Sequence, residues 1–233
     1  MSLLPRQLGI FAKHWRPGHV KTRLAKSIGD AAAADLAKCF LTTLVQRLSH
    51  VVATRQIGFA PPESVDAFRP LAPLAPKWEL RPQCDGDLGA RMADYFRAGF
   101  DAGHASVMLL GADCPTVPLG HIERAFEMLN DHQLVLGPAG DGGYYLIAAR
   151  HGAPAVFDLP RWGDNEVLSR TLELARQRGI TTGLCPAWQD VDEPADLARL
   201  RDELHDVSRV ALPEFAALRE LIDSIPQEQF GDV

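Results

Sequence analysis

Short apolar runs alternate along this chain with longer segments in which apolar residues recur at helical spacing. The runs at residues 7–12, 54–62 and 106–113 are bounded by turn residues, which is typical of strands buried in a parallel sheet. Between them, residues 30–50 and 87–103 carry an apolar residue at every third or fourth position. This spacing predicts amphipathic helices, with Asp30 as the N-cap of the first.

The second half of the chain continues the alternation with one exception. Residues 133–139 and 143–149 are two strand-like runs joined through the sequence GDGG, residues 140–143. Four residues are too few for a helical crossover, so we expect these two strands to be antiparallel. A helix over 165–179, a strand-like run over 181–191 and a helix over 193–204 follow. The pattern predicts a single α/β sandwich with helices on both faces of a mixed, mostly parallel sheet.

Two segments fall outside this alternation. Residues 61–76 carry five prolines, which predicts a loop with a turn or two instead of a regular helix. Residues 207–233 predict one more amphipathic helix with polar ends. We therefore expect one domain over 1–206, followed by a helical tail over 207–233.

Composition narrows the class of protein. The chain has 233 residues, is 46% hydrophobic and carries a net charge of −6, so it can bury a core. It has no basic stripe, which argues against a nucleic-acid polymer as partner. It has no apolar run of about eighteen residues to span a membrane. The start MSLLPRQ does not resemble a signal peptide, and the four cysteines are scattered, which together indicate a cytoplasmic protein.

Acidic residues directly follow three of the predicted strands. Asp113 ends the run at 106–113, Asp141 follows the run at 133–139, and Asp190 and Asp192 close the last strand-like segment. Ligands of open α/β sheets bind beyond the carboxyl ends of the strands. We therefore expect these carboxylates to gather at one edge of the sheet.

A cationic loop follows the first strand. The stretch WRPGHVKTRLA, residues 15–25, places Lys21 and Arg23 after a Pro-Gly turn. A protein of net negative charge needs local cations to hold phosphates, and Mg²⁺ is bound by one or two carboxylates together with substrate phosphates. Carboxylates facing these cations predict a site for a divalent ion, Mg²⁺ or Mn²⁺, and an anionic ligand.

Each of these features also has a purely structural interpretation. Asp113 could be a turn residue, the late acidic segment could only cap the helix that starts near Pro194, and GDGG could be a plain turn. Lys21 and Arg23 could be a solvated loop face. The chain has no GxxxxGK[ST] loop, so it is not a Walker-type phosphate binder.

Five segments together resemble a known family. In chain order they are FAKHWRPGHVKTRLA, DGDLGARMADYF, LLGADCPTVP, LVLGPAGDGGYYLIA and DVDEPADLARL. They resemble a bacterial family of glycosyltransferase-A-like (GT-A-like) proteins in the nucleotide-diphospho-sugar transferase superfamily. The plan is also similar to that of nucleotidyltransferases of the 2-phospholactate guanylyltransferase type. The resemblance implies a single-domain, three-layer GT-A-like fold.

The resemblance also implies roles for particular residues. The implied nucleotide-binding residues are Pro17, Gly18, Lys21, Thr22, Arg23, Gly111 and Ala112. The implied metal ligands are Asp113, Asp190 and Asp192. The implied acceptor-binding residues are Asp141, Gly142 and Gly143. Lys21 and Arg23 would stabilise charge on the leaving group, and Asp141 could act as a base.

These features favour a divalent-metal-dependent transferase that uses a nucleotide donor and a small-molecule acceptor. The paired cations favour nucleotidyl transfer from a nucleoside triphosphate to a phosphorylated or hydroxyl acceptor, with release of pyrophosphate. Glycosyl transfer from a nucleotide-diphospho-sugar is the alternative, since the same ion would hold the diphosphate leaving group. A third alternative is a non-catalytic nucleotide-binding protein.

Overall fold

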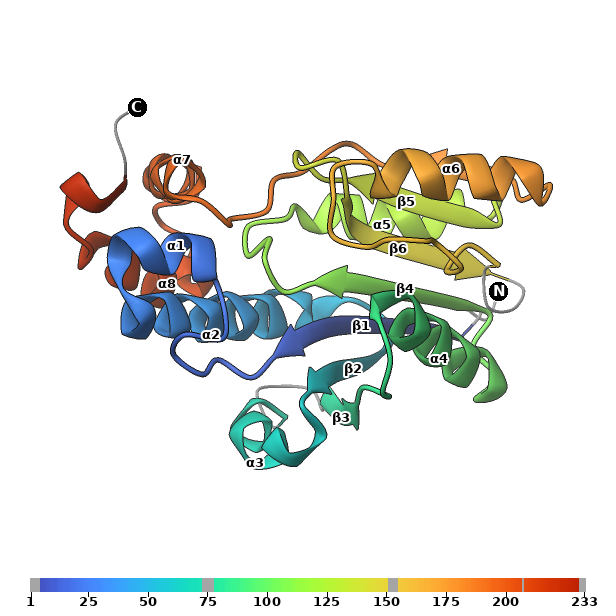
Figure 1. Cartoon of the computed structure of the whole chain (residues 1–233), viewed down its shortest axis with the longest axis horizontal. Coiled ribbons are helices and arrows are strands. Elements are labelled where there is room, and N and C mark those ends of the chain that lie inside the picture. Colours follow the sequence, from blue (N-terminus) through green and yellow to red (C-terminus); the bar gives the residue numbers. More distant parts are fainter. Residues whose placement is uncertain (1–4, 73–77, 151–154, 207, 231–233) are drawn as a thin grey trace.

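Seven strands form one sheet in the computed structural model, which describes residues 5–72, 78–150, 155–206 and 208–230. The strand order is β3-β2-β1-β4-β6-β5-β7 (Figure 1). The strands are β1 (Arg6–Lys13), β2 (Thr54–Ala60), β3 (Trp78–Pro82), β4 (Ser106–Gly111), β5 (Leu134–Pro138), β6 (Tyr144–Arg150) and β7 (Thr182–Leu184). β6 runs antiparallel to both of its neighbours, and every other pair is parallel. The predicted mixed, mostly parallel sheet is confirmed.

Helices cover both faces of the sheet, as predicted. They are α1 (Thr22–Ile28), α2 (Asp30–Arg47), α3 (Val65–Phe68), α4 (Leu88–Asp101), α5 (Leu119–Met128), α6 (Val167–Gln177), α7 (Pro194–His205) and α8 (Ala216–Asp223). α2 and α5 pack on one face and α4 and α6 on the other, which gives three layers. The N-cap of α2 is Gly29 and not Asp30, which is the first helical residue. In the described part of the chain, each helix is too short or too polar to cross a membrane.

The central strand β1 shows how the sequence specifies these layers. Leu8 and Ile10 are fully buried on the face covered by α2. Gly9 points to the opposite face, where Tyr95 of α4 packs so closely that a Cβ on Gly9 would lie 2.2 Å from the Tyr95 hydroxyl. Phe11 meets the same tyrosine ring edge to face, with centroids 5.5 Å apart. A glycine inside the strand therefore allows α4 to approach the sheet.

Two predicted segments differ from the structure. The strand over 181–191 is only the three-residue β7, because Pro186 has no amide hydrogen to donate and irregular backbone follows it. The proline-rich segment folds into the 3₁₀ turns Pro62–Ser64 and Arg69–Leu71 with α3 between them, since prolines are tolerated in the first turn of a helix. Its residues 73–76 lie outside the described residues.

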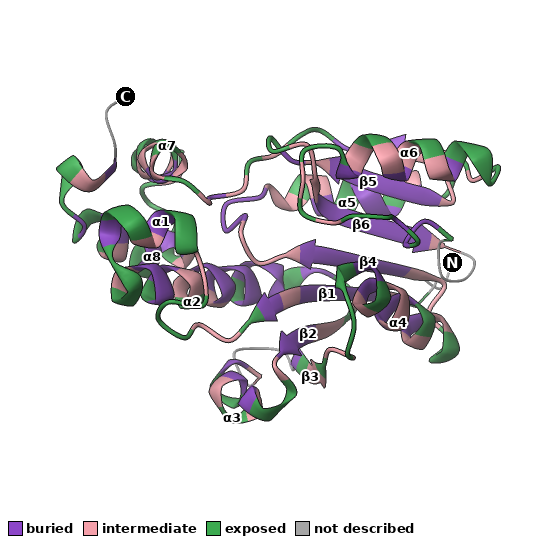
Figure 2. Cartoon of the chain, viewed as in Figure 1, coloured by how far each residue is buried: buried purple, intermediate pink, exposed green. Residues whose placement is uncertain are grey.

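A second core lies beyond the carboxyl edge of the sheet, where α1, α2, α7 and α8 pack together (Figure 1). Phe215 and Leu218, from the predicted C-terminal tail, are buried in it beside Leu24 of α1 and Phe40 of α2. Figure 2 shows buried stretches on α1, α2 and α8 at this end of the molecule. The tail therefore shares its hydrophobic core with the two helices that follow the first strand.

Candidate active site

Lys21 lies at the centre of the candidate site. It is the N-cap of α1 and adopts the left-handed conformation, with φ 47°, which is uncommon for a residue other than glycine. Its side chain is only 4% exposed. The ammonium donates to Asp192 Oδ1 at 3.0 Å and to the Val191 carbonyl at 2.8 Å, and it forms an ion pair with Asp113. Three distant segments therefore meet at one buried cation.

The two carboxylates that face Lys21 are not helix caps. Asp113 lies two residues beyond the end of β4, and α5 begins only at Leu119. The Val191 amide donates to the Asp113 carbonyl at 3.0 Å, which fixes the late acidic segment against the loop after β4.

The N-terminus of α7 is capped by other acids. Glu193 and Asp196 form a capping box there, and Asp196 Oδ2 accepts the amides of Asp192 and Glu193. The side chain of Asp192 is therefore left to contact Lys21.

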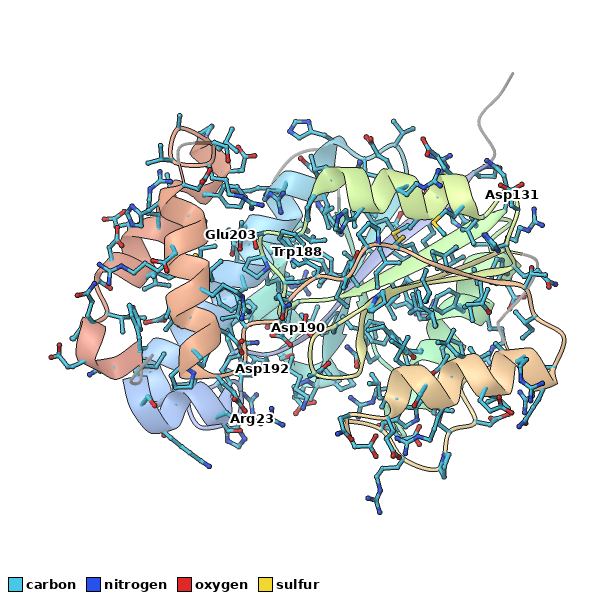
Figure 3. The ribbon with its side chains drawn as sticks, turned by 90° about the horizontal axis from the view of Figure 1, so that it is seen from above. Arg23, Asp131, Trp188, Asp190, Asp192 and Glu203 are labelled. Carbon is cyan, nitrogen blue, oxygen red and sulfur yellow. The ribbon has the colours of Figure 1, made fainter. Side chains whose placement is uncertain are left out.

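Asp190 is the third predicted metal ligand. Burial, and repulsion from Asp113, Asp192 and Asp141, raise the pKa of Asp190 from 3.8 to about 7, against an opposing effect of Lys21. In Figure 3, Asp190 and Asp192 lie along the segment that joins the sheet to α7. The concentration of negative charge at this edge is therefore greater than one lysine offsets.

Arg23 differs from Lys21 although it is only two residues away. Its side chain is 63% exposed and lies 3.5 Å from Glu193, which is similarly exposed. Such a pair contributes little to stability, because solvent screens it. Arg23 therefore lies near the N-terminus of α7, in the region that Figure 3 shows with Arg23 and Asp192 labelled.

A cavity of about 630 Å³ opens next to Lys21. Six of the predicted site residues line it: Lys21, Thr22, Gly111, Ala112, Asp113 and Asp192. Pro17, Gly18, Arg23 and Asp190 lie outside this lining. Residues of the loop after β1 and of the loop after β4 therefore line the same cavity, as expected for a site at the carboxyl ends of parallel strands.

The predicted acceptor residues lie in a tight turn between β5 and β6. Asp141 Oδ1 accepts the Gly143 amide at 2.8 Å, which closes the turn. Gly142 has φ 86°, and a Cβ there would lie 2.1 Å from the carbonyl oxygen of Asn165. These contacts give the turn a structural role, and its part in acceptor binding stays a prediction.

Sequence reasoning missed part of the cavity wall. Lys13, Gln83, Asp87 and Arg91 also line it. Gln83 directly follows β3, and Asp87 caps α4, with Oδ1 accepting the Ala90 amide at 2.8 Å. Three of the four lie in or beside the segment DGDLGARM, which is part of one of the five segments that carry the family resemblance. That resemblance is the signal in the sequence that could have pointed to them.

The acidic residues fit a divalent ion only in part. The side chains of Asp113 and Asp192 are 47% and 38% exposed, so both keep oxygen atoms that can reach a ligand in the cavity. Within the described ranges, no three histidine, cysteine, aspartate or glutamate side chains are grouped as a ready-made metal centre. Two carboxylates together with substrate phosphates are a usual environment of Mg²⁺.

The fold and the site define a GT-A-like nucleotide-binding transferase. Residues 43–164 match the family described as "Uncharacterized protein conserved in bacteria (DUF2064)", and the chain belongs to this family. A curated relative, 3-phospho-D-glycerate guanylyltransferase of Phenylobacterium zucineum (strain HLK1), is 30% identical over 187 residues, which cover 76% of this chain and 81% of that protein.

Solved structures agree with this assignment. A candidate nucleotide-diphospho-sugar transferase from Desulfovibrio desulfuricans G20 is 33% identical, with a TM-score of 0.85 over 95% of this chain and 98% of that one. A nucleotidyl transferase from Methanothermobacter thermautotroptrophicus is 18% identical, with a TM-score of 0.60 over 85% and 97%. The second likeness concerns the fold alone. The relatives together support the nucleotidyltransferase class of enzyme.

Proposed function

We propose that this protein transfers a nucleotidyl group, GMP foremost, from a nucleoside triphosphate to the phosphate of a small phosphorylated acid. The observation that carries the proposal is the buried Lys21, shared by Asp113 and Asp192 at the wall of a cavity large enough for a nucleotide. The guanylyltransferase relative supports the choice of donor and of acceptor class.

In the proposed reaction, an oxygen of the acceptor phosphate attacks the α-phosphorus of the donor in line. The bond from that phosphorus to the oxygen bridging to the β-phosphorus breaks, and pyrophosphate leaves with the electron pair. The products are the nucleoside diphosphate derivative of the acceptor and pyrophosphate. Catalysis then depends on position and on electrostatic stabilisation of the growing charge, not on a covalent intermediate.

Lys21 supplies a positive charge that does not depend on pH in the neutral range. Burial lowers the pKa of Lys21, but the nearby carboxylates of Asp113 and Asp192 outweigh this effect and hold its pKa above 10.5. The ammonium has three N–H donors, which can be shared between carboxylates and a phosphate oxygen. Arg23, which is exposed, adds a second cation for the leaving pyrophosphate.

Asp113 and Asp192 are the residues that would hold a divalent cation, with Asp190 behind them. When bound, such an ion neutralises phosphate charge and polarises the α-phosphoryl group. The carboxylates position the loops after β4 and before α7 around the donor. Without a cation beyond Lys21, the acids would repel a triphosphate, so donor binding should need the ion.

Pyrophosphate release tests the proposal. Purified protein is incubated with Mg²⁺, each of four nucleoside triphosphates, and 3-phospho-D-glycerate or the matched acid without its phosphate. We expect release with GTP and the phosphorylated acid only. Absence of release from every triphosphate, with transfer from a GDP- or UDP-sugar instead, would show glycosyl transfer. Nucleotide binding without either reaction would show the non-catalytic alternative.

A further inference from the structure

A second cavity of about 370 Å³ lies beside the main one, between the ends of β1, β2 and β3. The two cavities share four lining residues: Lys13, His19, Gln83 and Arg91. They are therefore adjoining parts of one hollow. Asp113 and Asp192 line only the main part, so the shared wall is distinct from the part of the site around these two acids.

Arg91 is held in a fixed position on this shared wall. Its Nε donates to the Gly86 carbonyl at 3.0 Å, and its Nη1 is 3.3 Å from Gln83 Oε1. The amide nitrogen of Gln83 donates to the Gly58 carbonyl of β2 at 2.7 Å. The guanidinium is thus tied to the sheet through Gln83, while its Nη2 has no hydrogen-bond partner among the described residues. A fixed guanidinium keeps the direction of its remaining donors.

The shared wall carries strong hydrogen-bond donors. Lys13, the exposed last residue of β1, and Arg91 can only donate hydrogen bonds. Both functional groups of the Gln83 amide are already used within the protein. Acceptors come from Asp85 in the second cavity and from Asp87 in the main cavity. The wall therefore offers strong donors with carboxylate acceptors nearby.

We infer that this shared wall reads the base of the donor and selects guanine, an inference that rests on the proposed nucleotidyl transfer. Guanine presents two adjacent acceptors, O6 and N7, which are the usual partners of lysine and arginine. Its N1–H and N2 amino group are donors that a carboxylate of Asp85 or Asp87 can accept. Adenine and cytosine each place an amino donor where guanine has O6, so they would face the cations with the wrong group.

The position of the phosphates agrees with this assignment. Lys21, Asp113 and Asp192 define the end of the cavity that suits a polyphosphate and its cation. The base must then bind away from them, and the shared wall with Lys13 and Arg91 continues into the second cavity, which neither Asp113 nor Asp192 lines. The cations of this wall could also hold phosphate, and the experiment separates the two uses.

The test pairs protein variants with base analogues. Binding of GTP, 7-deaza-GTP, which lacks the N7 acceptor, and ATP is measured by calorimetry with Mg²⁺ for the wild type and for Lys13→Met and Arg91→Met. We expect the wild type to bind GTP about tenfold or more tightly than either analogue. In at least one variant, the preference for GTP over 7-deaza-GTP should fall to about one, because the partner of N7 has been removed.

Controls keep the result interpretable. Lys26→Met removes an exposed lysine that does not line either cavity, and it should leave the preference unchanged. Arg91→Lys retains a donor if Arg91→Met alters the fold. Equal losses for all three nucleotides would assign Lys13 and Arg91 to the phosphates and overturn the inference. If the preference for GTP depends on these residues but no pyrophosphate is released, recognition of guanine by this wall would be supported and the proposed reaction refuted.

Discussion

The ammonium of Lys21 lies 3.0 Å from a carboxylate oxygen of Asp192, although 171 residues separate the two along the chain. The same ammonium pairs with Asp113 after β4. One buried cation therefore holds together the loop after the first strand, the loop after the fourth and the segment before α7. Because both carboxylates also line the cavity, the contact that stabilises these loops lies where a polyphosphate would bind.

Replacement of Lys21 by methionine should impair turnover by about a hundredfold or more. Loss of one charged contact in a closed site costs about 2.7–4 kcal/mol of transition-state stabilisation. Methionine keeps the length and apolar character of the lysine stem, so the fold should survive. Pyrophosphate release with GTP and the phosphorylated acid measures the effect, with Lys26→Met as the matched control. A rate near that of the wild type would remove Lys21 from the mechanism.

The same variant should bind divalent cations more tightly when no nucleotide is present. In the wild type, the ammonium of Lys21 repels a second cation near Asp113 and Asp192. A like charge about 4 Å away costs about 1–4 kcal/mol in a partly solvated site, so we expect Mn²⁺ affinity to rise about tenfold or more in Lys21→Met.

Electron paramagnetic resonance of free Mn²⁺ measures this affinity directly. Asp113→Asn should shift it in the opposite direction, because one of the two carboxylates loses its charge. Unchanged Mn²⁺ affinity in both variants would show that these residues do not hold the ion.

Asp190 should make the protein less stable as the pH rises from about 4 to 7. The pKa of Asp190 is raised from 3.8 to about 7 in the fold, so the folded state keeps a proton that the unfolded state releases. In this window the free energy of unfolding falls with pH by up to about 1.4 kcal/mol per unit for this group. The contribution of protonated Asp190 to the free energy of unfolding is fully present below pH 3.8 and is lost above about pH 7.

Asp190→Asn removes that dependence. Relative to the wild type, the variant should gain stability progressively between pH 4 and 7 and keep the gain at pH 8. Urea unfolding at pH 4.5 and 8.0, in EDTA and without nucleotide, compares the two. An equal difference at both pH values would mean that the carboxyl group of Asp190 does not titrate in this range.

The sequence predicts the three layers well because buried apolar residues recur with the spacing of a strand or of a helix in each element. In β1, Leu8 and Ile10 alternate with Gly9 and Phe11, and the two sets face different helix layers. The antiparallel pair follows from the four-residue connection GDGG. The short length of β7 could not be predicted. Cys185 and Val191, which follow β7, are buried like strand residues although they lie outside any strand.

The candidate site is predictable only where its residues directly follow strands. Asp113 and Asp192 both contact Lys21, although β6 and β5 separate β4 from β7 in the sheet. The different environments of Lys21 and Arg23 are invisible in the sequence, because they depend on the left-handed backbone at Lys21 and on the position of α7. Nor does the sequence reveal that Glu193, and not Asp192, caps α7.

The C-terminal helix α8 should be required for the stability of the site as well as of the chain. Phe215 is 1% exposed and lies in the same core as Leu24 of α1, the helix that starts directly after Lys21. Truncation of a buried phenylalanine to alanine costs about 3–5 kcal/mol. We therefore expect Phe215→Ala to lower the free energy of unfolding by that amount, whereas Val210→Ala, at a residue 43% exposed, should leave it nearly unchanged.

The same variant tests whether the tail acts as an independent appendage. If residues 207–233 were an appendage, Phe215→Ala would leave unfolding of the rest of the chain unaffected, and GTP would bind as in the wild type. Because α1 and α8 share a core, we expect one cooperative unfolding transition at lower urea and weaker GTP binding at temperatures where the variant is still folded. Circular dichroism during urea unfolding and calorimetric titration with GTP measure the two effects separately.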